Sequence, residues 1–379
     1  MYPRLQKAMG EALALVRHSK VGDATAVIRA ALTGSDADVP AGNAIEKRVK
    51  APAKITAQQP ATKLNPTVSP YRQPRKTLSK RISGPAGQLK DGQRSFRARI
   101  YQHPERSLDY MLYLPKPLDT RSPSLLVMLH GCNQDPKDFA VGTQMNRYAD
   151  EFNFIVAYPQ QPKTANSLGC WNWFDPRHQK HGAGEPALLA GLTEELRTEF
   201  NVSKERIFVA GLSAGGAMAE ILATEYSDIF AAAGIHSGLP YGAAHSVTSA
   251  FSAMRGSSRV ERPREKPPSV NARRIVFHGS KDATVHPSNG AQIVKQARSR
   301  TAGLSDIRYD EDDNGAKVDR TDFKNSDGTT QAEYWVILGG GHAWSGGNRE
   351  GSFTSPKGPN ASREMLRFFS EGKKSAGRE

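Results

Sequence analysis

The stretch IFVAGLSAGGAMAEILATEY, residues 207–226, decides the fold of this chain. It opens with an apolar run typical of a buried strand and continues as an alanine-rich run typical of a helix. At the junction, GLSAG at residues 211–215 matches the pattern G-x-S-x-G. Between a strand and a helix this pattern predicts a strained turn, with small residues two positions before and after the serine because the backbones pass too close for a Cβ. The sequence therefore predicts that Ser213 stands above the edge of a sheet as a nucleophile.

Short apolar runs alternate with helical patterns from about residue 93 onwards. Runs that are apolar almost throughout, as expected of strands buried on both faces, lie at 125–131, 154–160, 206–213, 231–238 and 273–280. Helices are expected near 139–151, 185–200, 215–226 and 287–300. This alternation predicts an α/β fold in which helices cover both faces of a mostly parallel sheet. Ligands then gather at the carboxyl ends of the strands.

Three other segments complete the expected domain. Residues 96–102 and 108–115 alternate like antiparallel edge strands, and the irregular residues 239–272 are expected to form a loop over the site. Residues 305–330 are expected to form a hairpin leading into a strand at 332–338. The acidic patch Asp310, Glu311, Asp312 and Asp313 in this hairpin lacks the ligand order of a calcium loop, which favours a solvated turn over a metal site.

A serine nucleophile needs a base to take its proton and an acid to orient that base. In this kind of fold the order along the chain is serine, acid, histidine. Asp282 follows the expected strand at 273–280, and His342 follows the expected strand at 332–338. Both positions lie at the carboxyl ends of strands, on the edge that carries Ser213. The sequence therefore predicts Asp282 as the orienting carboxylate and His342 as the general base.

Other residues compete for these roles. His278 ends its strand and is a candidate core histidine, His286 precedes its expected place in the order, and His236 is interpreted as structural. The alternative acids are Asp306, Asp310 and Asp313.

Acyl transfer also needs N–H donors for the negative oxygen of the tetrahedral intermediate, each contributing about 3 kcal/mol. The backbone N–H of Ala214, directly after the nucleophile, is one predicted donor. The second is predicted from the loop His130-Gly131-Cys132, through the N–H of Cys132, because a glycine lets this loop fold back tightly.

The two cysteines of the chain lie in loops that the alternation puts on the active edge. A disulfide between Cys132 and Cys170 that braces the oxyanion hole is therefore expected, with two free buried thiols as the alternative. Trp171, Trp173 and Trp344 are candidates to line an acyl pocket, or else they fill the core. Two cysteines without a clear histidine pair fall short of a zinc set, so neither a metal nor a cofactor is expected.

The first quarter of the chain differs in composition from the rest. Residues 1–34 show two helical stripes and predict a small helical hairpin, and residues 35–94 are rich in Ala, Pro, Thr and Lys and predict a disordered basic linker. Of the net charge of +14, residues 35–99 carry +10, from 14 basic and 4 acidic residues. The catalytic domain is expected at 95–371 and a flexible tail at 372–379. Because the basicity belongs to the linker, we expect no specific nucleic acid partner, although the linker could contact polyanions weakly.

The sequence also bears on the compartment. No run reaches the roughly 18 apolar residues of a membrane span. Charges at Arg4, Lys7, Glu11 and Arg17 interrupt any apolar run of a secretory signal, which favours a cytoplasmic location.

Six separated motifs resemble those of one esterase family. They are HGCNQD at 130–135, CWNWF at 170–174, GLSAGGAM at 211–218, HSGLPYGAA at 236–244, HGSKDATV at 278–285 and GGGHAWSGG at 339–347. Together they resemble the polyhydroxybutyrate depolymerase-type esterases, which include feruloyl and acetylxylan esterases, over about residues 95–370. The resemblance implies an α/β-hydrolase fold and a triad of Ser213, Asp282 and His342. It also makes an extracellular location the alternative to the cytoplasmic one.

These observations predict a serine carboxylic-ester hydrolase that works through an acyl-enzyme. Short-chain hydroxyalkanoate esters and feruloyl or acetyl sugar esters are the substrates that the resemblance implies. The alternative is a non-catalytic binding module that keeps the hydrolase fold and contacts polyanions through its basic tail.

Overall fold

A computed structural model of the chain describes residues 96–103, 106–121, 123–257, 272–301 and 303–371. The expected helical hairpin at 1–34, the basic linker at 35–94 and the tail at 372–379 lie outside the described residues. The chain divides into two units between Ile82 and Ser83, and every described residue belongs to the second.

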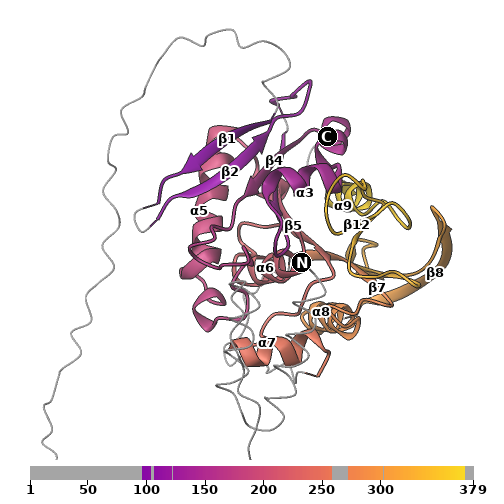
Figure 1. The fold of residues 1–379 in the computed structure, drawn as a ribbon. Helices are drawn as coiled ribbons and strands as arrows, with labels where there is room; N and C mark the ends of the chain where they lie inside the picture. The colour runs from indigo at the N-terminus through magenta and orange to yellow at the C-terminus, as the bar shows by residue number, and fades with distance from the viewer. Residues whose placement is uncertain (1–95, 104–105, 122, 258–271, 302, 372–379) are drawn as a thin grey trace, which may run out of the picture. The chain divides into compact units, whose positions relative to one another are not determined.

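Ten strands of the described residues form a single sheet in the order β1-β2-β4-β3-β5-β6-β7-β10-β9-β8 (Figure 1). The strands are β1 (Phe96–Tyr101), β2 (Leu108–Tyr113), β3 (Ser124–Leu129), β4 (Phe154–Pro159), β5 (Ile207–Leu212), β6 (Ala232–His236), β7 (Arg273–Gly279), β8 (Ser305–Asp313), β9 (Ala316–Lys324) and β10 (Thr330–Ile337). From β4 to β10 in this order neighbouring strands are parallel, whereas β1, β2, β8 and β9 pair antiparallel. The carboxyl ends of the parallel strands therefore meet at one edge of the sheet.

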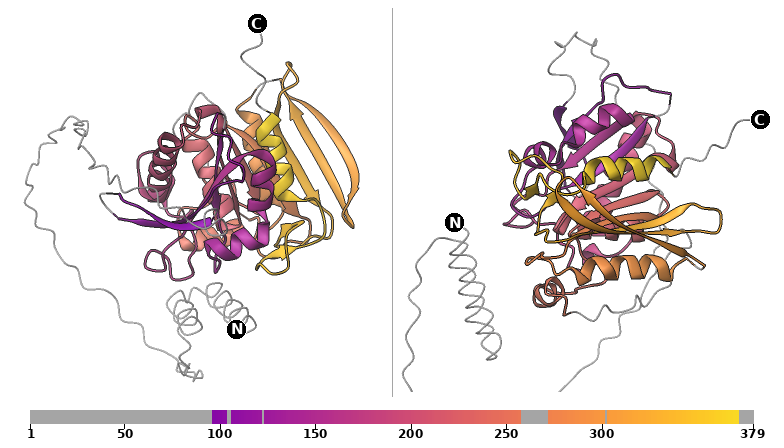
Figure 2. Two further views of the ribbon diagram at one scale, coloured as in Figure 1. Left: turned by 90° about the horizontal axis from the view of Figure 1, so that it is seen from above. Right: turned by 90° about the vertical axis from the view of Figure 1, so that its right-hand side faces the viewer.

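Helices cover both faces of the sheet. They are α3 (Pro136–Thr143), α4 (Met145–Phe152), α5 (Gly184–Glu199), α6 (Ala214–Glu225), α7 (Val247–Met254), α8 (Ser288–Ser299) and α9 (Ala361–Glu371). The apolar residues of α5, α6, α7 and α8 join one core cluster, and those of α3, α4 and α9 join another. Figure 2 shows α9 and α8 on opposite sides of the strands. None of the described helices is long and apolar enough to cross a membrane.

The strand β3 illustrates why the central runs are apolar throughout. Leu125, Val127 and Leu129 face the first core cluster, and the intervening Leu126 and Met128 face the second. Every residue of β3 is buried, as in β4 and β5. Successive side chains of a strand point to opposite faces, so a sheet covered on both sides requires an unbroken apolar run. The predicted α/β class is confirmed.

Some local predictions differ from the structure. The helix expected at 139–151 is two helices, because Gln144 between α3 and α4 takes a left-handed φ of 54°. The irregular region expected at 239–272 contains α7, which begins at a capping box on Ser246. The acidic patch does not form a turn: Asp310 to Asp313 lie in β8, and the turn falls at Asn314 and Gly315. The helix α9 was not anticipated.

Candidate active site

Ser213 lies at the junction between β5 and α6 with a φ of 58° and a ψ of −118°. Few non-glycine residues adopt a positive φ, and such strain is stored at functional sites. The positions two residues before and after Ser213 require glycine for steric reasons. A Cβ added at Gly211 would lie 2.4 Å from the carbonyl carbon of Gly215, and one added at Gly215 would lie 2.0 Å from the Leu129 oxygen. The predicted strand–turn–helix junction is therefore present, and only glycine fits at these two positions.

Asp282 and His342 are joined by a hydrogen bond. His342 Nδ1 lies 2.8 Å from Asp282 Oδ2, and the two residues follow β7 and β10, which are neighbours in the sheet. The other carboxylate oxygen, Oδ1, accepts hydrogen bonds from the backbone N–H groups of Thr284 and Val285 at 2.9 and 2.8 Å. Burial raises the pKa of Asp282, but the His342 hydrogen bond and charge outweigh it, so this pKa lies below its ordinary value. Asp282 is thus an ionised, fixed carboxylate that can hold His342 in one orientation.

His236 links the turn at Ser213 to the segment that follows His342. Its backbone oxygen accepts a hydrogen bond from Ser213 N–H at 2.9 Å, and its ring Nε2 accepts one from Ser345 N–H at 3.1 Å, three residues beyond His342. Among the described residues, Ser213 Oγ and His342 Nε2 form no hydrogen bond with each other. Catalytic hydrogen bonds of this kind often tighten only when substrate binds.

The rival histidines have other partners. His236 is fully buried between the rings of Phe277 and Trp344, and burial lowers its pKa to about 3. His278 is also buried, and its Nε2 lies 2.8 Å from the Val285 oxygen and 3.5 Å from Asp282 Oδ2. His286 is exposed and bonds to Ser288. His278 thus contacts Asp282 and its loop, whereas His236 packs against Phe277 and Trp344.

The rival acids lie away from His342. Asp306, Asp310 and Asp313 all belong to β8, which is the outermost strand and is separated from β10 by β9. Asp306 faces Arg308 at 3.8 Å. No group of three or more His, Cys, Asp or Glu side chains within the described ranges is arranged to hold a metal ion.

The predicted oxyanion loop, His130-Gly131-Cys132, lies against Ser213. A Cβ added at Gly131 would lie 3.6 Å from Ser213 Cβ. The N–H of Gly131 is occupied by Gln134 Oε1 at 2.9 Å, whereas no hydrogen bond to any described residue engages the N–H of Cys132. Ala214 is the first residue of α6, so its N–H belongs to the helical donors without an intrahelical acceptor. Cys132 and Ala214 therefore keep free donors next to Ser213.

Three links join the oxyanion loop to the loop after β4. A disulfide connects Cys132 with Cys170, as predicted. Asn133 N–H donates to the Leu168 oxygen at 2.8 Å, and Gln161 N–H donates to His130 Nε2 at 3.1 Å. Burial lowers the pKa of His130, so its ring stays a neutral acceptor. The loop after β4 thus holds the loop that contains Cys132 at His130, Cys132 and Asn133.

The three tryptophans are buried. Trp171, Trp344 and Trp173 expose 0%, 1% and 6% of their surface. Trp344 stacks on His236 and donates from Nε1 to Ser362 Oγ at 3.1 Å, and Trp171 packs near the His130 ring. Their burial favours the core-packing interpretation, and the pocket role stays a prediction.

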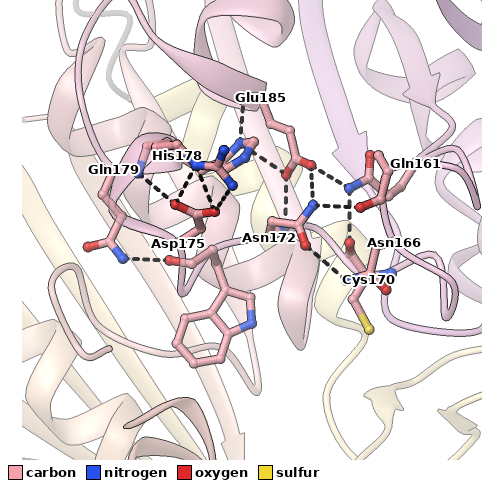
Figure 3. A network of polar contacts seen from close by, with 11 residues as sticks. Gln161, Asn166, Cys170, Asn172, Asp175, His178, Gln179 and Glu185 are labelled. Carbon is pink, nitrogen blue, oxygen red and sulfur yellow. Dashed lines mark hydrogen bonds and ion pairs between the residues drawn. The ribbon is translucent and has the colours of Figure 1, made fainter. Parts of the chain in front are cut away.

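Sequence reasoning missed a polar cluster behind the disulfide. Glu185, in the first turn of α5, is fully buried, and its carboxylate accepts hydrogen bonds from Asn172 N–H, Asn172 Nδ2 and Gln161 Nε2 (Figure 3). Gln134, which holds Gly131, was missed as well. The available signal was the unusual density of Asn and Gln directly after the strands at 125–131 and 154–160, on the active edge.

Comparison with known proteins gives a family match. The model of the family described as Esterase PHB depolymerase matches residues 108–310, which include Ser213 and Asp282 and end before His342. Poly(3-hydroxyalkanoate) depolymerase C of Paucimonas lemoignei is 30% identical over 252 residues, covering 62% of this chain and 58% of the relative. Feruloyl esterase B of Neurospora crassa is 31% identical over 199 residues, covering 48% and 67%. The chain thus spans less than two thirds of the depolymerase.

A solved structure supports the fold. An acetyl xylan esterase from Aspergillus awamori superposes with a TM-score of 0.55 at 20% identity, covering 72% of this chain and 99% of that one. At this identity the likeness concerns the fold alone. The chain has the α/β-hydrolase fold.

Proposed function

Because the chain belongs to the Esterase PHB depolymerase family, we propose that it is a serine carboxylic-ester hydrolase. The observation that carries the proposal is the Asp282–His342 hydrogen bond of 2.8 Å at the edge of the sheet where Ser213 occupies its strained turn. A buried carboxylate on the Nδ1 of a histidine, next to a serine in such a turn, is the arrangement of serine acyl transfer.

The proposed mechanism has two halves. Ser213 Oγ attacks the ester carbonyl while His342 Nε2 takes its proton, and the alcohol leaves with that proton, so that the acyl group remains on the serine. Water then attacks the acyl-enzyme with His342 again as base, and the acid product leaves. Asp282 keeps the imidazole in one tautomer and stabilises its charged form. The N–H groups of Cys132 and Ala214 stabilise the negative oxygen in both halves.

The relatives suggest the substrate range. Their names refer to poly(3-hydroxyalkanoate), feruloyl and acetylxylan esters. For this chain we propose the same range, namely short-chain hydroxyalkanoate esters or feruloyl and acetyl sugar esters. The alternative function is a non-catalytic binding module that contacts polyanions through its basic tail. That tail lies outside the described residues, and a module of this kind would hydrolyse no ester.

We also propose that the protein acts in an oxidising compartment. Disulfides persist in oxidising compartments and are rare in the cytosol. The Cys132–Cys170 bond therefore supports an extracellular or otherwise oxidising location over the cytoplasmic one expected from the first residues.

Hydrolysis of p-nitrophenyl acetate tests the proposed function. We expect Ser213→Ala to lower kcat at least about 10³-fold, because the remaining contacts can bind the ester but cannot form the acyl-enzyme. The control is Ser299→Ala, an exposed serine at the end of α8 on the opposite edge of the sheet, which should match the wild type. Equal rates for Ser213→Ala and the wild type would exclude the enzyme and leave the binding module.

A further inference from the structure

Gln134 is a buried side chain beside the oxyanion loop that the proposed mechanism does not use. It exposes 6% of its surface. Its Oε1 accepts the Gly131 N–H at 2.9 Å, and its Nε2 donates to Asp138 Oδ2 at 3.0 Å and to the Ser352 backbone oxygen at 3.0 Å. Because one end of the amide faces a donor and the other end faces acceptors, the amide has a single orientation.

These contacts join the oxyanion loop to a distant part of the chain. Ser352 lies 218 residues from Gln134 along the sequence. Its N–H donates to Asp138 Oδ1 at 2.8 Å, and its hydroxyl donates to Asp138 Oδ2 at 2.5 Å. Asp138 belongs to the first turn of α3. The three side chains thus form a closed network in which each member is bonded directly to the other two.

The segment that contains Ser352 also lies against the proposed base. Phe353 is the next residue, and its backbone oxygen accepts the Trp344 N–H at 2.7 Å, two residues beyond His342. Its ring meets the His342 ring edge-on, with 6.5 Å between the ring centroids. Phe353 has a φ of 52°, which few bulky residues adopt and which lasts only where neighbouring contacts enforce it. The bonds at Ser352 supply such contacts on one side.

The proposed mechanism requires two parts of the site to stay aligned. The N–H of Cys132 has to face the negative oxygen while His342 reaches the hydroxyl of Ser213, and these groups come from loops after different strands. We propose that Gln134 is a positioning residue, which holds the oxyanion loop in a fixed place relative to the segment packed against His342. This inference rests on the proposed esterase function and adds to it a residue that touches no reacting atom.

Removal of both ends of the amide tests the role of Gln134. Gln134→Met keeps the length of the side chain and loses all of its hydrogen bonds. From the p-nitrophenol burst with p-nitrophenyl acetate, we expect acylation to slow at least about tenfold while the dissociation constant of the ester changes less than about twofold, because misaligned catalytic groups slow the chemical step without weakening binding. An unchanged acylation rate would overturn the proposal.

The matched control is Gln296→Met. Gln296 is partly buried in α8, and its amide also donates to a backbone oxygen, that of Tyr241, at 3.0 Å. This variant loses a comparable hydrogen bond away from the oxyanion loop and should acylate at the wild-type rate. Equal losses in both variants would assign the effect to general destabilisation and contradict a positioning role.

Gln134→Glu separates the two ends of the amide. It keeps an acceptor for Gly131 but turns a carboxylate toward Asp138 of α3 and toward the carbonyl and hydroxyl of Ser352, which do not titrate. At pH 8 we expect acylation to slow at least about tenfold. A carboxylate beside another carboxylate binds a proton more readily, and the protonated form donates again.

The rate of Gln134→Glu, divided by the wild-type rate at the same pH, should therefore rise at least about threefold between pH 8 and pH 6. Division by the wild-type rate removes the titration of His342 from the comparison. A wild-type rate at pH 8 would mean that holding Gly131 is sufficient, and a flat ratio would contradict the donor role. Either result would remove the link to Ser352.

A double-mutant cycle tests the network from its other corner. Asp138→Ala leaves Gln134 in place, so it remains informative even if Gln134→Met does not fold. We expect Asp138→Ala alone to slow acylation at least about threefold, and the double variant to be no more than about twofold slower than Gln134→Met, because residues of one network are not additive. A wild-type rate in Asp138→Ala, or losses that multiply in the double variant, would refute the network.

The outcomes separate the two proposals. If Gln134→Met acylates at the wild-type rate while Ser213→Ala is inactive, the positioning role is wrong and the esterase stands. If Ser213→Ala still hydrolyses p-nitrophenyl acetate at the wild-type rate, the esterase itself is wrong.

Discussion

At the scale of single residues, Asp282 is the one on which the orientation of His342 depends. Its two carboxylate oxygens have separate partners: Oδ1 accepts two backbone N–H groups, and Oδ2 faces His342. The backbone bonds fix the carboxylate, so the imidazole is fixed in turn. A neutral amide at this position could keep the shape but would present its NH₂ group or an uncharged oxygen to His342.

Replacing Asp282 by asparagine should therefore remove the negative charge of this side chain while keeping its shape. We expect Asp282→Asn to lower kcat for p-nitrophenyl acetate by about 10³- to 10⁴-fold, because the wrong tautomer of His342 is favoured and its charged form loses a partner. The matched control is Asp306→Asn on β8, which should keep wild-type kcat. A wild-type rate in Asp282→Asn, or a comparable loss in the control, would assign the acid elsewhere.

At the scale of structural elements, the position of the Cys132 loop depends on its contacts with a second loop. The loop after β3 contains Cys132, the proposed oxyanion donor. The loop after β4 holds it through the disulfide, the Asn133–Leu168 hydrogen bond and the His130–Gln161 hydrogen bond. Neither loop belongs to a helix or strand that could position it alone. The covalent link closes a segment with a sequence separation of 38 residues, which restricts the unfolded chain.

Reduction of this bond should destabilise the protein. Chain entropy for a loop of this length predicts a loss of roughly 3 to 4 kcal/mol in the free energy of unfolding. We expect dithiothreitol to lower the urea midpoint of the wild type and to have no effect on the double variant Cys132→Ser/Cys170→Ser. Since the chain has only two cysteines, the double variant controls for every other effect of the reductant. An equal response of both proteins would mean that the bond does not form.

For the whole molecule, three buried histidines make stability depend on pH. His130 follows β3, His236 ends β6 and His278 lies one residue before the end of β7, and burial lowers the pKa of each. For His236 the pKa falls to about 3 from an ordinary value of 6.5. Below pH 6.5 the unfolded chain binds a proton that the folded protein does not bind, so acidification favours unfolding until the pH reaches the folded pKa.

The free energy of unfolding should therefore fall as the pH is lowered. Each histidine that stays neutral contributes a slope of up to about 1.4 kcal/mol per pH unit below 6.5. Urea unfolding of the wild type and His236→Gln at pH 7.5, 6.5 and 5.0 measures this. We expect the wild type to lose up to about 2 kcal/mol more than the variant between pH 6.5 and 5.0. Parallel pH profiles would show that folding does not lower the pKa of His236.

The prediction from sequence was strongest where neighbours along the chain decide the structure. The turn at Ser213 depends on glycines two residues away, and the buried strands follow from their apolar runs, so both were anticipated. The break at Gln144 was not, because the nearest glycine, Gly142, lies inside α3 and does not mark the position where the helix ends. Glu185 resembled an ordinary acidic residue in a first helical turn, and only its burial beneath Asn172 and Gln161 reveals its role.

By itself, the sequence determined the α/β class, the strained serine turn and the order serine, acid, histidine, because each of these follows from a local pattern or from chain order. The tertiary structure decided that Asp282 rather than an acid of β8 meets His342, because strand order in the sheet brings β7 beside β10 and leaves β8 at the edge. It also decided that the Gln161 amide turns its acceptor away from Glu185, because that orientation depends on partners from separate segments that meet only in the folded protein.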